Sequence, residues 1–264
     1  MDTYDEVRNL LDALRLRDAL NVLDAALPDK GAKRVAALRF VQHLLREEVN
    51  RRTERRIDRR LRDARLPDRP TLETFDFDFQ PTIDRDLVLE LATLAWVDRR
   101  EDLLLIGQSG VGKSHIGKAL CLVACGQGRW VLYTTCADML QDLYASLADD
   151  TLPHRLRRYT RPQLLMIDDL GYDPIEQEKA REAQLLYKVL EARHQNVSTI
   201  VASNLSVDLW PDYLGDRFLT VALLDRLLFH ATTITIEGPS YRLAEHMKRN
   251  RRDVPPEEEP QLDK

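Results

Sequence analysis

The chain has 264 residues, 44% hydrophobic and 31% charged, which is typical of a globular protein and fits one good-sized core plus a small extra module. No apolar run approaches the roughly 20 residues of a membrane span, and the N-terminus lacks the apolar core of a signal peptide, so we expect a cytoplasmic protein without a membrane partner. The formal net charge of −5 does not by itself indicate a nucleic-acid partner.

The first predicted element is a helical segment over residues 4–66. Apolar residues recur along it at helical spacing, for example from Val35 to Val49, and Pro67 follows its last turn. We predict a small all-helical domain over residues 1–66 that serves DNA binding and assembly.

The end of this segment is rich in arginine. Residues 51–65 hold eight Arg and three acids, whereas the last twelve residues are acidic, so the charge along the chain is segregated. Seven of these arginines form a stripe at helical spacing and predict contacts with the phosphates of duplex DNA: Arg51, Arg52, Arg55, Arg56, Arg59, Arg60 and Arg62. No aromatic residues interleave, which disfavours stacking on single strands. A solvated helix, paired through Glu47 and Glu48, is the alternative.

A proline-bearing linker follows over residues 67–81. Its TFDFDFQP stretch places Phe75, Phe77 and Phe79 on one side if the backbone is extended. We interpret it as a docking linker.

Short apolar runs then alternate with longer amphipathic segments. Five runs predict strands: LLLIG (103–107), VLYTT (131–135), LLMID (164–168), TIVASN (199–204) and TITIEG (233–238). This alternation indicates a five-stranded parallel sheet flanked by helices, in one α/β domain over residues 82–245. A charged and disordered tail is expected over 246–264, where the acidic end cannot bury a core.

The three cysteines are Cys121, Cys125 and Cys136. They fit a reducing compartment. No His or Cys pair elsewhere completes a four-ligand zinc set, so we predict that they are buried small hydrophobes.

The first predicted strand ends in GQSGVGKS, with a helical pattern directly after it. This strand, loop and helix context predicts a P-loop, in which backbone N–H groups surround phosphates and Lys113 reaches the β and γ oxygens. Ser114 would ligate Mg²⁺. The predicted nucleotide contacts are Gly107, Gln108, Ser109, Gly110, Val111, Gly112, Lys113 and Ser114.

Two adjacent acids, Asp168 and Asp169, end the third predicted strand. In P-loop NTPases an acid at such a strand end holds Mg²⁺, which predicts this role for Asp168. Asp169 stands where an acid polarises the attacking water. Glutamate is usual there, and the missing methylene is expected to slow hydrolysis unless the strand end moves closer to the water. A solvated surface acid is the alternative for Asp169.

Asn204 ends the next strand, where a γ-phosphate is expected. Its amide can orient water between itself and Asp169, although a strand-end cap suits Asn equally well. No Asn-Lys-x-Asp motif for guanine occurs, so ATP is favoured over GTP.

Two arginines fit a nucleotide role. Arg226 lies in the apolar pattern ALLDRLLFH, and Arg242 lies in GPSYR after the last strand. An arginine from a neighbouring subunit completes many such sites, which we predict for Arg226. An ion pair with Asp225 or another nearby acid is the alternative.

The order of GQSGVGKS, LLMIDDLGY, ASN, LLDRL and GPSYR, after an Arg-rich helix and FDFDFQP, closely resembles the IstB family of transposition helper ATPases, relatives of the DnaC helicase loaders in the AAA+ class. The resemblance covers roughly residues 8–245. It implies an ATP-hydrolysing homo-oligomer with ATP at subunit junctions, which assembles on duplex DNA, deforms it and activates a transposase. By the same resemblance Asn204 senses the water, Arg226 is the finger in trans and Arg242 is a second sensor.

Two departures and two other functions accompany this interpretation. Only about 26 residues follow the last predicted strand, too few for the helical lid of larger AAA+ proteins, a lid that this branch lacks according to the resemblance. The family usually carries Asp-Glu where this chain has Asp168-Asp169. A replicative-helicase loader would share every nucleotide motif, and a nucleotide-gated DNA-binding scaffold with little turnover would share the binding residues.

Overall fold

The computed structural model describes residues 2–28, 31–172 and 179–252. Two compact units divide the chain, Met1–Arg59 and Arg60–Lys264. Within the described ranges, no helix is both long and apolar enough to cross a membrane. Where the sequence predicted a first domain ending at residue 66, the boundary of the compact units falls earlier, within a long helix.

The first unit is helical, as predicted. Its helices are α1 (Thr3–Ala13), α2 (Arg17–Ala26) and the part of α3 (Ala32–Asp63) that precedes Arg60. A small apolar core lies between them, built from Val7, Leu11, Leu23, Leu27 and Leu38. Because this core is small, the long polar remainder of α3 is mostly solvated.

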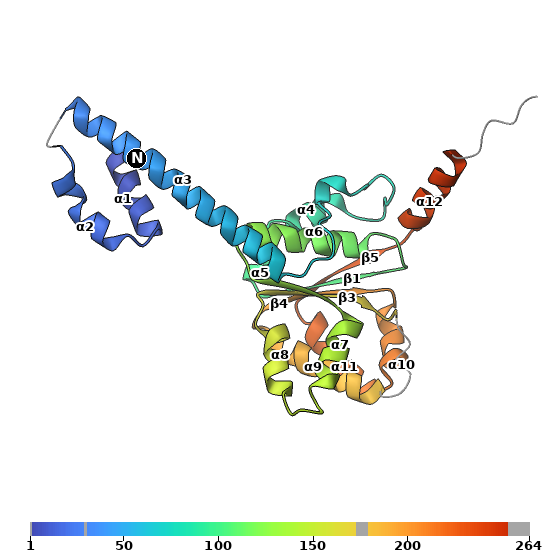
Figure 1. The fold of residues 1–264 in the computed structure, drawn as a ribbon. Helices are drawn as coiled ribbons and strands as arrows, with labels where there is room; N and C mark the ends of the chain where they lie inside the picture. The colour runs from blue at the N-terminus through green and yellow to red at the C-terminus, as the bar shows by residue number, and fades with distance from the viewer. Residues whose placement is uncertain (1, 29–30, 173–178, 253–264) are drawn as a thin grey trace, which may run out of the picture. The chain divides into compact units, whose positions relative to one another are not determined.

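The second unit is built on a parallel five-stranded sheet (Figure 1). The strands are β1 (Asp102–Gly107), β2 (Val131–Thr135), β3 (Leu164–Leu170), β4 (Ser198–Ser203) and β5 (Ala231–Ile236). Their order across the sheet is β2-β3-β4-β1-β5, which places β1 between β4 and β5. All five predicted strands are confirmed, and β2 has the predicted bounds.

Helices cover both faces of the sheet, so the strands are buried on both sides (Figure 1). One face carries α4 (Arg85–Leu91), α5 (Ala95–Asp98) and α6 (Lys113–Gly126). The other carries α7 (Cys136–Ala145), α8 (Leu152–Thr160), α9 (Lys179–Arg193), α10 (Trp210–Leu214), which follows the short turn η2 (Val207–Leu209), and α11 (Arg217–Leu228). Burial of both faces explains why the strands are continuous apolar runs.

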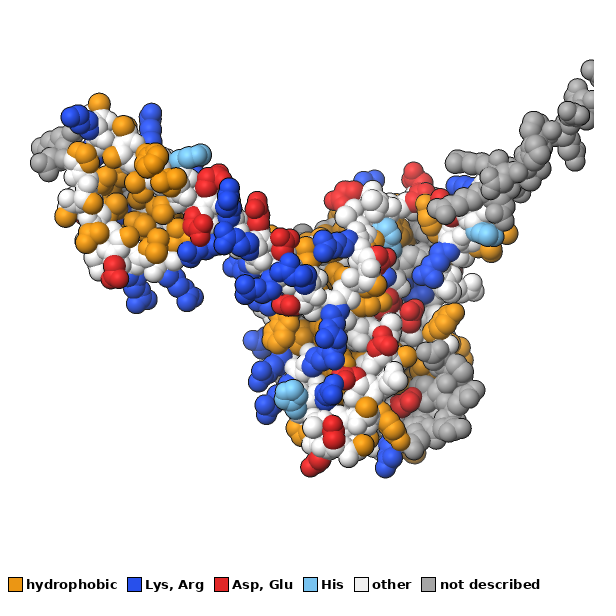
Figure 2. All heavy atoms as spheres, viewed as in Figure 1, with side chains coloured by type: hydrophobic (Ala, Val, Ile, Leu, Met, Phe, Trp, Pro, Cys, Tyr) orange, Lys and Arg blue, Asp and Glu red, His pale blue; other side chains and the backbone are white. Residues whose placement is uncertain are grey.

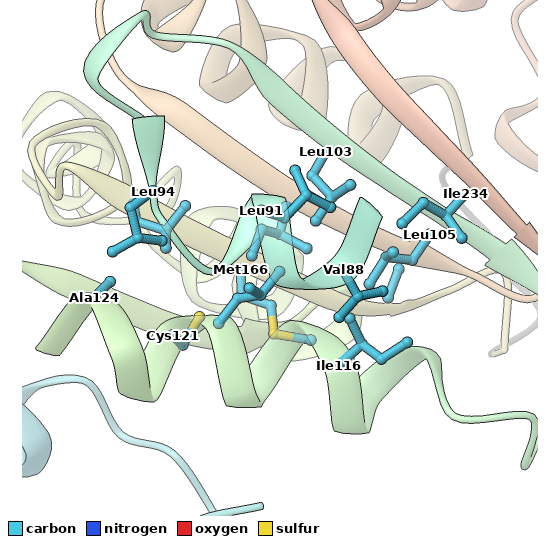
Figure 3. Packing of buried hydrophobic residues seen from close by; sticks show 14 of the residues in the cluster. Val88, Leu91, Leu94, Leu103, Leu105, Ile116, Cys121, Ala124, Met166 and Ile234 are labelled. Carbon is cyan, nitrogen blue, oxygen red and sulfur yellow. The ribbon is translucent and has the colours of Figure 1, made fainter. Parts of the chain in front are cut away.

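Figure 3 shows the packing on the α6 face. Leu103 and Leu105 of β1 meet Ile116 and Cys121 of α6, and Met166 of β3 lies among them. Alternate strand residues point to opposite faces of the sheet. Leu104 of β1 and Leu165 of β3 therefore belong to the apolar cluster on the other face. All three cysteines are buried, which confirms their prediction as small buried hydrophobes.

The predicted linker does not run extended. A short 3-10 turn, η1 (Leu72–Thr74), is followed by a turn in which the Asp76 carboxylate accepts the Phe79 N–H at 3.0 Å. Phe75 and Phe77 therefore pack edge to face with centroids 4.8 Å apart, while Phe79 packs against Tyr241 instead. The condition for one shared side, an extended backbone, is not met, because the turn redirects the third ring. The docking role of the linker stays a prediction.

The last element is α12 (Tyr241–Arg252). It extends the helical structure through residues 246–252, which the sequence assigned to a disordered tail. The remaining tail residues, 253–264, lie outside the described residues.

Candidate functional site

The glycine-rich loop joins β1 to α6 in a tight turn. Gly110 and Gly112 have φ of +83° and +111°, in the region that side chains rarely adopt. An added Cβ would lie 2.1 Å from Ser240 Oγ at Gly110 and 2.6 Å from the Phe75 ring at Gly112. Both backbone conformation and neighbouring side chains therefore require glycine here.

This loop borders a pocket of about 230 Å³. The pocket gathers most of the residues predicted for the nucleotide site: Ser109, Gly110, Val111, Gly112, Lys113, Ser114, Asp169, Asn204 and Arg242. Residues of the linker, including Phe75 and Gln80, form another part of its wall. Gly107, Gln108 and Asp168 lie at the same strand ends but do not line it. Segments from five places in the sequence thus meet around one cavity.

Lys113 is buried at the base of the loop. Its side-chain Nζ donates to the Gln108 carbonyl oxygen at 2.7 Å, and the residue is 7% exposed. Burial lowers the pKa of this ammonium, while the charges of Asp168 and Asp169 oppose that shift. A phosphate oxygen could replace the carbonyl as the partner of Nζ, in a loop whose N–H groups favour anions.

Asp168 is buried and tightly oriented. Its Oδ1 accepts the Ser114 hydroxyl at 2.9 Å and the Asp169 N–H at 3.0 Å, and its Oδ2 accepts the Tyr133 hydroxyl at 3.0 Å. A hydroxyl and a carboxylate side by side fit Mg²⁺, which prefers oxygen ligands and takes few from the protein when phosphates supply others. No cluster of three or more His, Cys, Asp or Glu that could hold a metal occurs in the described ranges.

Asp169 reaches the pocket because the strand is irregular. Consecutive strand residues point to opposite faces, which would turn Asp169 away from Asp168. A register shift between Ile167 and Leu170, together with φ of +58° at Asp169, allows Asp169 to line the pocket while Asp168 stays buried beside Ser114. Burial raises the pKa of Asp169, and the charge of Asp168 raises it further.

Asn204 joins the ends of β3 and β4. Its backbone N–H donates to the Leu170 carbonyl at 3.2 Å. With the amide nitrogen turned toward its acceptors, the side chain donates to the carbonyls of Leu170 at 2.7 Å and Gly171 at 3.2 Å. This is the strand-end cap of the alternative interpretation. The amide oxygen is then the group left for a water in the pocket.

Arg242 lies at the start of α12, which is attached to the loop. The Tyr241 N–H donates to the Gly110 carbonyl at 3.0 Å, and Arg242 lines the pocket. Its charge acts to lower the pKa of both Lys113 and Asp169.

Arg226 does not line the pocket of its own chain. Its guanidinium pairs with Glu191 and lies over the Tyr187 ring, 5.1 Å from the centroid, while Nη1 donates to the Ala222 carbonyl at 3.1 Å. An ion pair of the kind that the alternative expected is therefore present, with Glu191 rather than Asp225. A role at phosphate requires the pocket of a second copy.

The seven arginines of the predicted DNA stripe lie on α3. Six are exposed and Arg60 is partly buried. Figure 2 shows Lys and Arg side chains gathered along the helix that Figure 1 labels α3. Arg52 is also used within the first unit, since it pairs with Glu48 at 2.7 Å and donates to the Leu14 carbonyl at 3.3 Å.

A second basic surface, on α8 and the residue that follows it, escaped the sequence prediction. It consists of Arg155, Arg157, Arg158 and Arg161, and Figure 2 shows basic side chains on that flank of the second unit. Arg155 and Arg158 share one carboxylate, Asp142, at 2.6 and 3.2 Å, so positive charge remains in excess. The signal was visible in the sequence, because residues 151–167 contain four Arg and no acid.

The model of the family described as IstB-like ATP binding protein matches residues 9–249. A Pseudomonas aeruginosa protein named for insertion sequence IS21 and ATP binding is 37% identical over 243 residues, 92% of this chain and 91% of its own. A Geobacillus stearothermophilus protein named for IS5376 is 34% identical over 78% of this chain and 81% of its own.

Two solved structures share the fold of the second unit. The DnaC helicase loader aligns with a TM-score of 0.51 and 18% identity, over 63% of this chain and 96% of its own. DnaA from Aquifex aeolicus bound to AMPPCP aligns with a TM-score of 0.52 and 20% identity, over 73% of this chain and 59% of its own. These likenesses are of fold, and with the five-stranded parallel sheet flanked by helices they confirm the predicted α/β fold class.

Proposed function

We propose that this chain, which belongs to the IstB-like ATP-binding protein family, is a DNA-dependent AAA+ ATPase that oligomerises on duplex DNA and assists a transposase in the transposition of an insertion sequence. The observation that carries the proposal is the pocket itself. Ser114 and Asp168 lie in contact, and Lys113, Asp169 and Asn204 surround the same cavity.

In this proposal ATP lies with its phosphates in the loop. Lys113 exchanges its bond to the Gln108 carbonyl for the β and γ oxygens, and the loop N–H groups surround the remaining charge. Ser114 and Asp168 would hold Mg²⁺, which neutralises charge on the phosphate oxygens when bound. The linker wall, with Phe75 and Gln80, lies beside the same pocket.

Hydrolysis requires a positioned water. We assign its polarisation to Asp169 and its second hydrogen bond to the Asn204 amide oxygen, since the nitrogen of that amide faces backbone carbonyls. Asp169 must be ionised for this role. A chain in which Asp169 fails to reach the water would bind ATP and turn over little, which is the scaffold alternative.

Assembly completes the site. Because Arg226 lies outside its own pocket, we propose that it leaves Glu191 and contacts the γ-phosphate bound by a neighbouring copy. Arg242 remains with the nucleotide of its own subunit. ATP would then stabilise the oligomer.

DNA contact is assigned to the arginine stripe of α3, with the helical unit serving binding and assembly. The basic surface of α8 adds three exposed arginines, Arg155, Arg157 and Arg161, and the partly buried Arg158 in the second unit. The α3 stripe suits the phosphate backbone of a duplex rather than stacking on single strands, since no aromatic residues interleave its arginines. On α8 the one aromatic residue among the arginines, Tyr159, is buried and so is not available for stacking.

The relatives favour transposition over helicase loading. Several are named for insertion sequences, whereas the likeness to the helicase loader is one of fold. The test is sedimentation of the full chain with duplex DNA in ATP, ADP or no nucleotide, followed by pull-down against a transposase and against a replicative helicase. ATP-dependent assembly on DNA and capture of that transposase are expected. Capture of a replicative helicase instead would support the loader, and nucleotide-independent behaviour would overturn the proposal.

A further inference from the structure

Tyr133 lies on β2 and points toward the α6 face of the sheet. It alternates with Leu132 of the opposite cluster and packs against the same core as Val131. Its hydroxyl donates to Asp168 Oδ2 at 3.0 Å. Burial raises the pKa of Tyr133 well above its usual range, so the group remains a neutral donor.

The two oxygens of Asp168 are held from different directions. Oδ1 faces Ser114 and the Asp169 N–H, both of which belong to the site. Oδ2 faces Tyr133, which belongs to the neighbouring strand. With both oxygens engaged, rotation of the carboxylate about its Cβ–Cγ bond would break a hydrogen bond, and the orientation is fixed before any ligand arrives.

Tyr133 is itself attached to the segment that leaves α3. Its backbone N–H donates to the Ala64 carbonyl at 2.8 Å, and Ala64 is fully buried one residue past the helix end. Lys118 Nζ lies 5.5 Å from the Tyr133 ring centroid and pairs with Asp68 at 2.8 Å. Residues 64–68 therefore contact this tyrosine twice, once directly and once through Lys118.

We infer that Tyr133 is a positioning residue that orients Asp168 for Mg²⁺ and links that carboxylate to the C-terminal end of the arginine-bearing helix. The inference rests on the proposed function and deepens it. If DNA binding to α3 displaces the C-terminal end of that helix, Ala64 and Asp68 would move with it. The Tyr133 hydroxyl, which donates to Asp168, would then move as well.

The same unit contains a matched pair away from the pocket. Tyr159 is buried and donates its hydroxyl to Asp142 Oδ2 at 2.7 Å, but Asp142 otherwise serves Arg155 and Arg158 of the α8 surface. If the hydroxyl of Tyr133 merely satisfied a buried acceptor, Tyr133→Phe and Tyr159→Phe would have the same consequences.

The first experiment measures equilibrium binding of a non-hydrolysable ATP analogue to the full chain during a Mg²⁺ titration. Tyr133→Phe keeps the ring and the backbone bond. We expect its half-saturating Mg²⁺ concentration to rise about 10-fold, with binding in EDTA unchanged. Tyr159→Phe is expected to match wild type. An unchanged Mg²⁺ dependence in folded Tyr133→Phe would overturn the inference.

The second experiment repeats the titration with duplex DNA. In wild type we expect DNA to shift the half-saturating Mg²⁺ concentration, and in Tyr133→Phe we expect that shift to be at least halved. A shift of equal size in both proteins, or none in wild type, would overturn the link to α3. Lys113→Ala separates the two proposals. If Lys113→Ala still binds the analogue, the nucleotide site itself is overturned. If Lys113→Ala loses analogue binding while Tyr133→Phe keeps the Mg²⁺ dependence of wild type, only this inference is overturned.

Discussion

The nucleotide pocket and the arginine-bearing helix α3 are both polar regions, but they are built differently. Around the pocket, Lys113 and Asp168 are nearly inaccessible, and each is oriented by hydrogen bonds of 2.7 to 3.0 Å. Along α3, six of the seven stripe arginines are exposed. A buried group depends on one geometry, so single substitutions should be severe. Exposed cations act collectively through a screened field, so single losses should be small.

The sharpest test of the first half of this comparison is Lys113→Ala. Loss of the ammonium leaves the β and γ oxygens without their strongest side-chain partner, and we expect at least about a 100-fold loss of ATP affinity. Equilibrium dialysis measures it. Lys33→Ala, an exposed lysine of the first unit, is the charge control and should bind normally. Equal affinity of the two variants would remove the P-loop interpretation.

Within a single chain Arg226 lies neither at the nucleotide pocket nor on α3. Its loss should still affect ATP turnover and DNA binding, because both depend on assembly. We expect Arg226→Ala to bind nucleotide as monomer, to lose ATP-driven assembly and tight DNA binding, and to lower turnover about 1000-fold. Sedimentation with ATP and DNA follows this.

Glu191→Gln is the matched control, since it breaks the same ion pair and keeps Arg226. If the effect of Arg226→Ala arises from that pair, the control will reproduce it. An Arg226→Ala protein that still assembles and binds DNA tightly would contradict the finger.

Asp169 tests whether hydrolysis can be separated from binding inside the pocket. Asp169→Asn should keep ATP affinity and lower turnover about 100-fold, whereas Asp169→Glu should keep or raise it. Burial and the charge of Asp168 raise the pKa of Asp169. On acidification the Asp169 carboxylate is therefore protonated at a higher pH than the carboxylate of a free aspartate. Turnover of wild type should therefore fall early on acidification. Full turnover in Asp169→Asn would exclude this residue as the base.

The smallest effects are expected from substitutions on α3. Arg55→Ala combined with Arg59→Ala should keep nucleotide binding and assembly and reduce duplex affinity only a few-fold at low salt. Its diagnostic is the slope of log affinity against log salt, which should fall by about one for each DNA phosphate that the variant no longer neutralises. Arg157→Ala with Arg161→Ala asks the same of the α8 surface. If neither double variant changes the slope, neither surface contacts DNA phosphates, and both are solvated helix faces.

Much of the fold could be predicted because its signals are local. Parallel strands buried on both faces are continuous apolar runs, and β2 has the predicted bounds, 131–135. The linker departs from an extended backbone for a local reason too. The Asp76 carboxylate accepts the Phe79 N–H, and the resulting turn ends the alternation that an extended backbone would have given the three rings.

The sequence by itself determined the loop, its lysine and the acids at the strand end, because a phosphate site needs glycines, a cation and carboxylates at fixed spacing. Tertiary structure decided which of these groups meet. The β2–β3 register, with Thr135 beside Asp168, brings the Tyr133 hydroxyl to that acid, and the shift after Ile167 brings Asp169 to the pocket. Register and irregularity arise from pairing between distant segments, so no single stretch of residues encodes them.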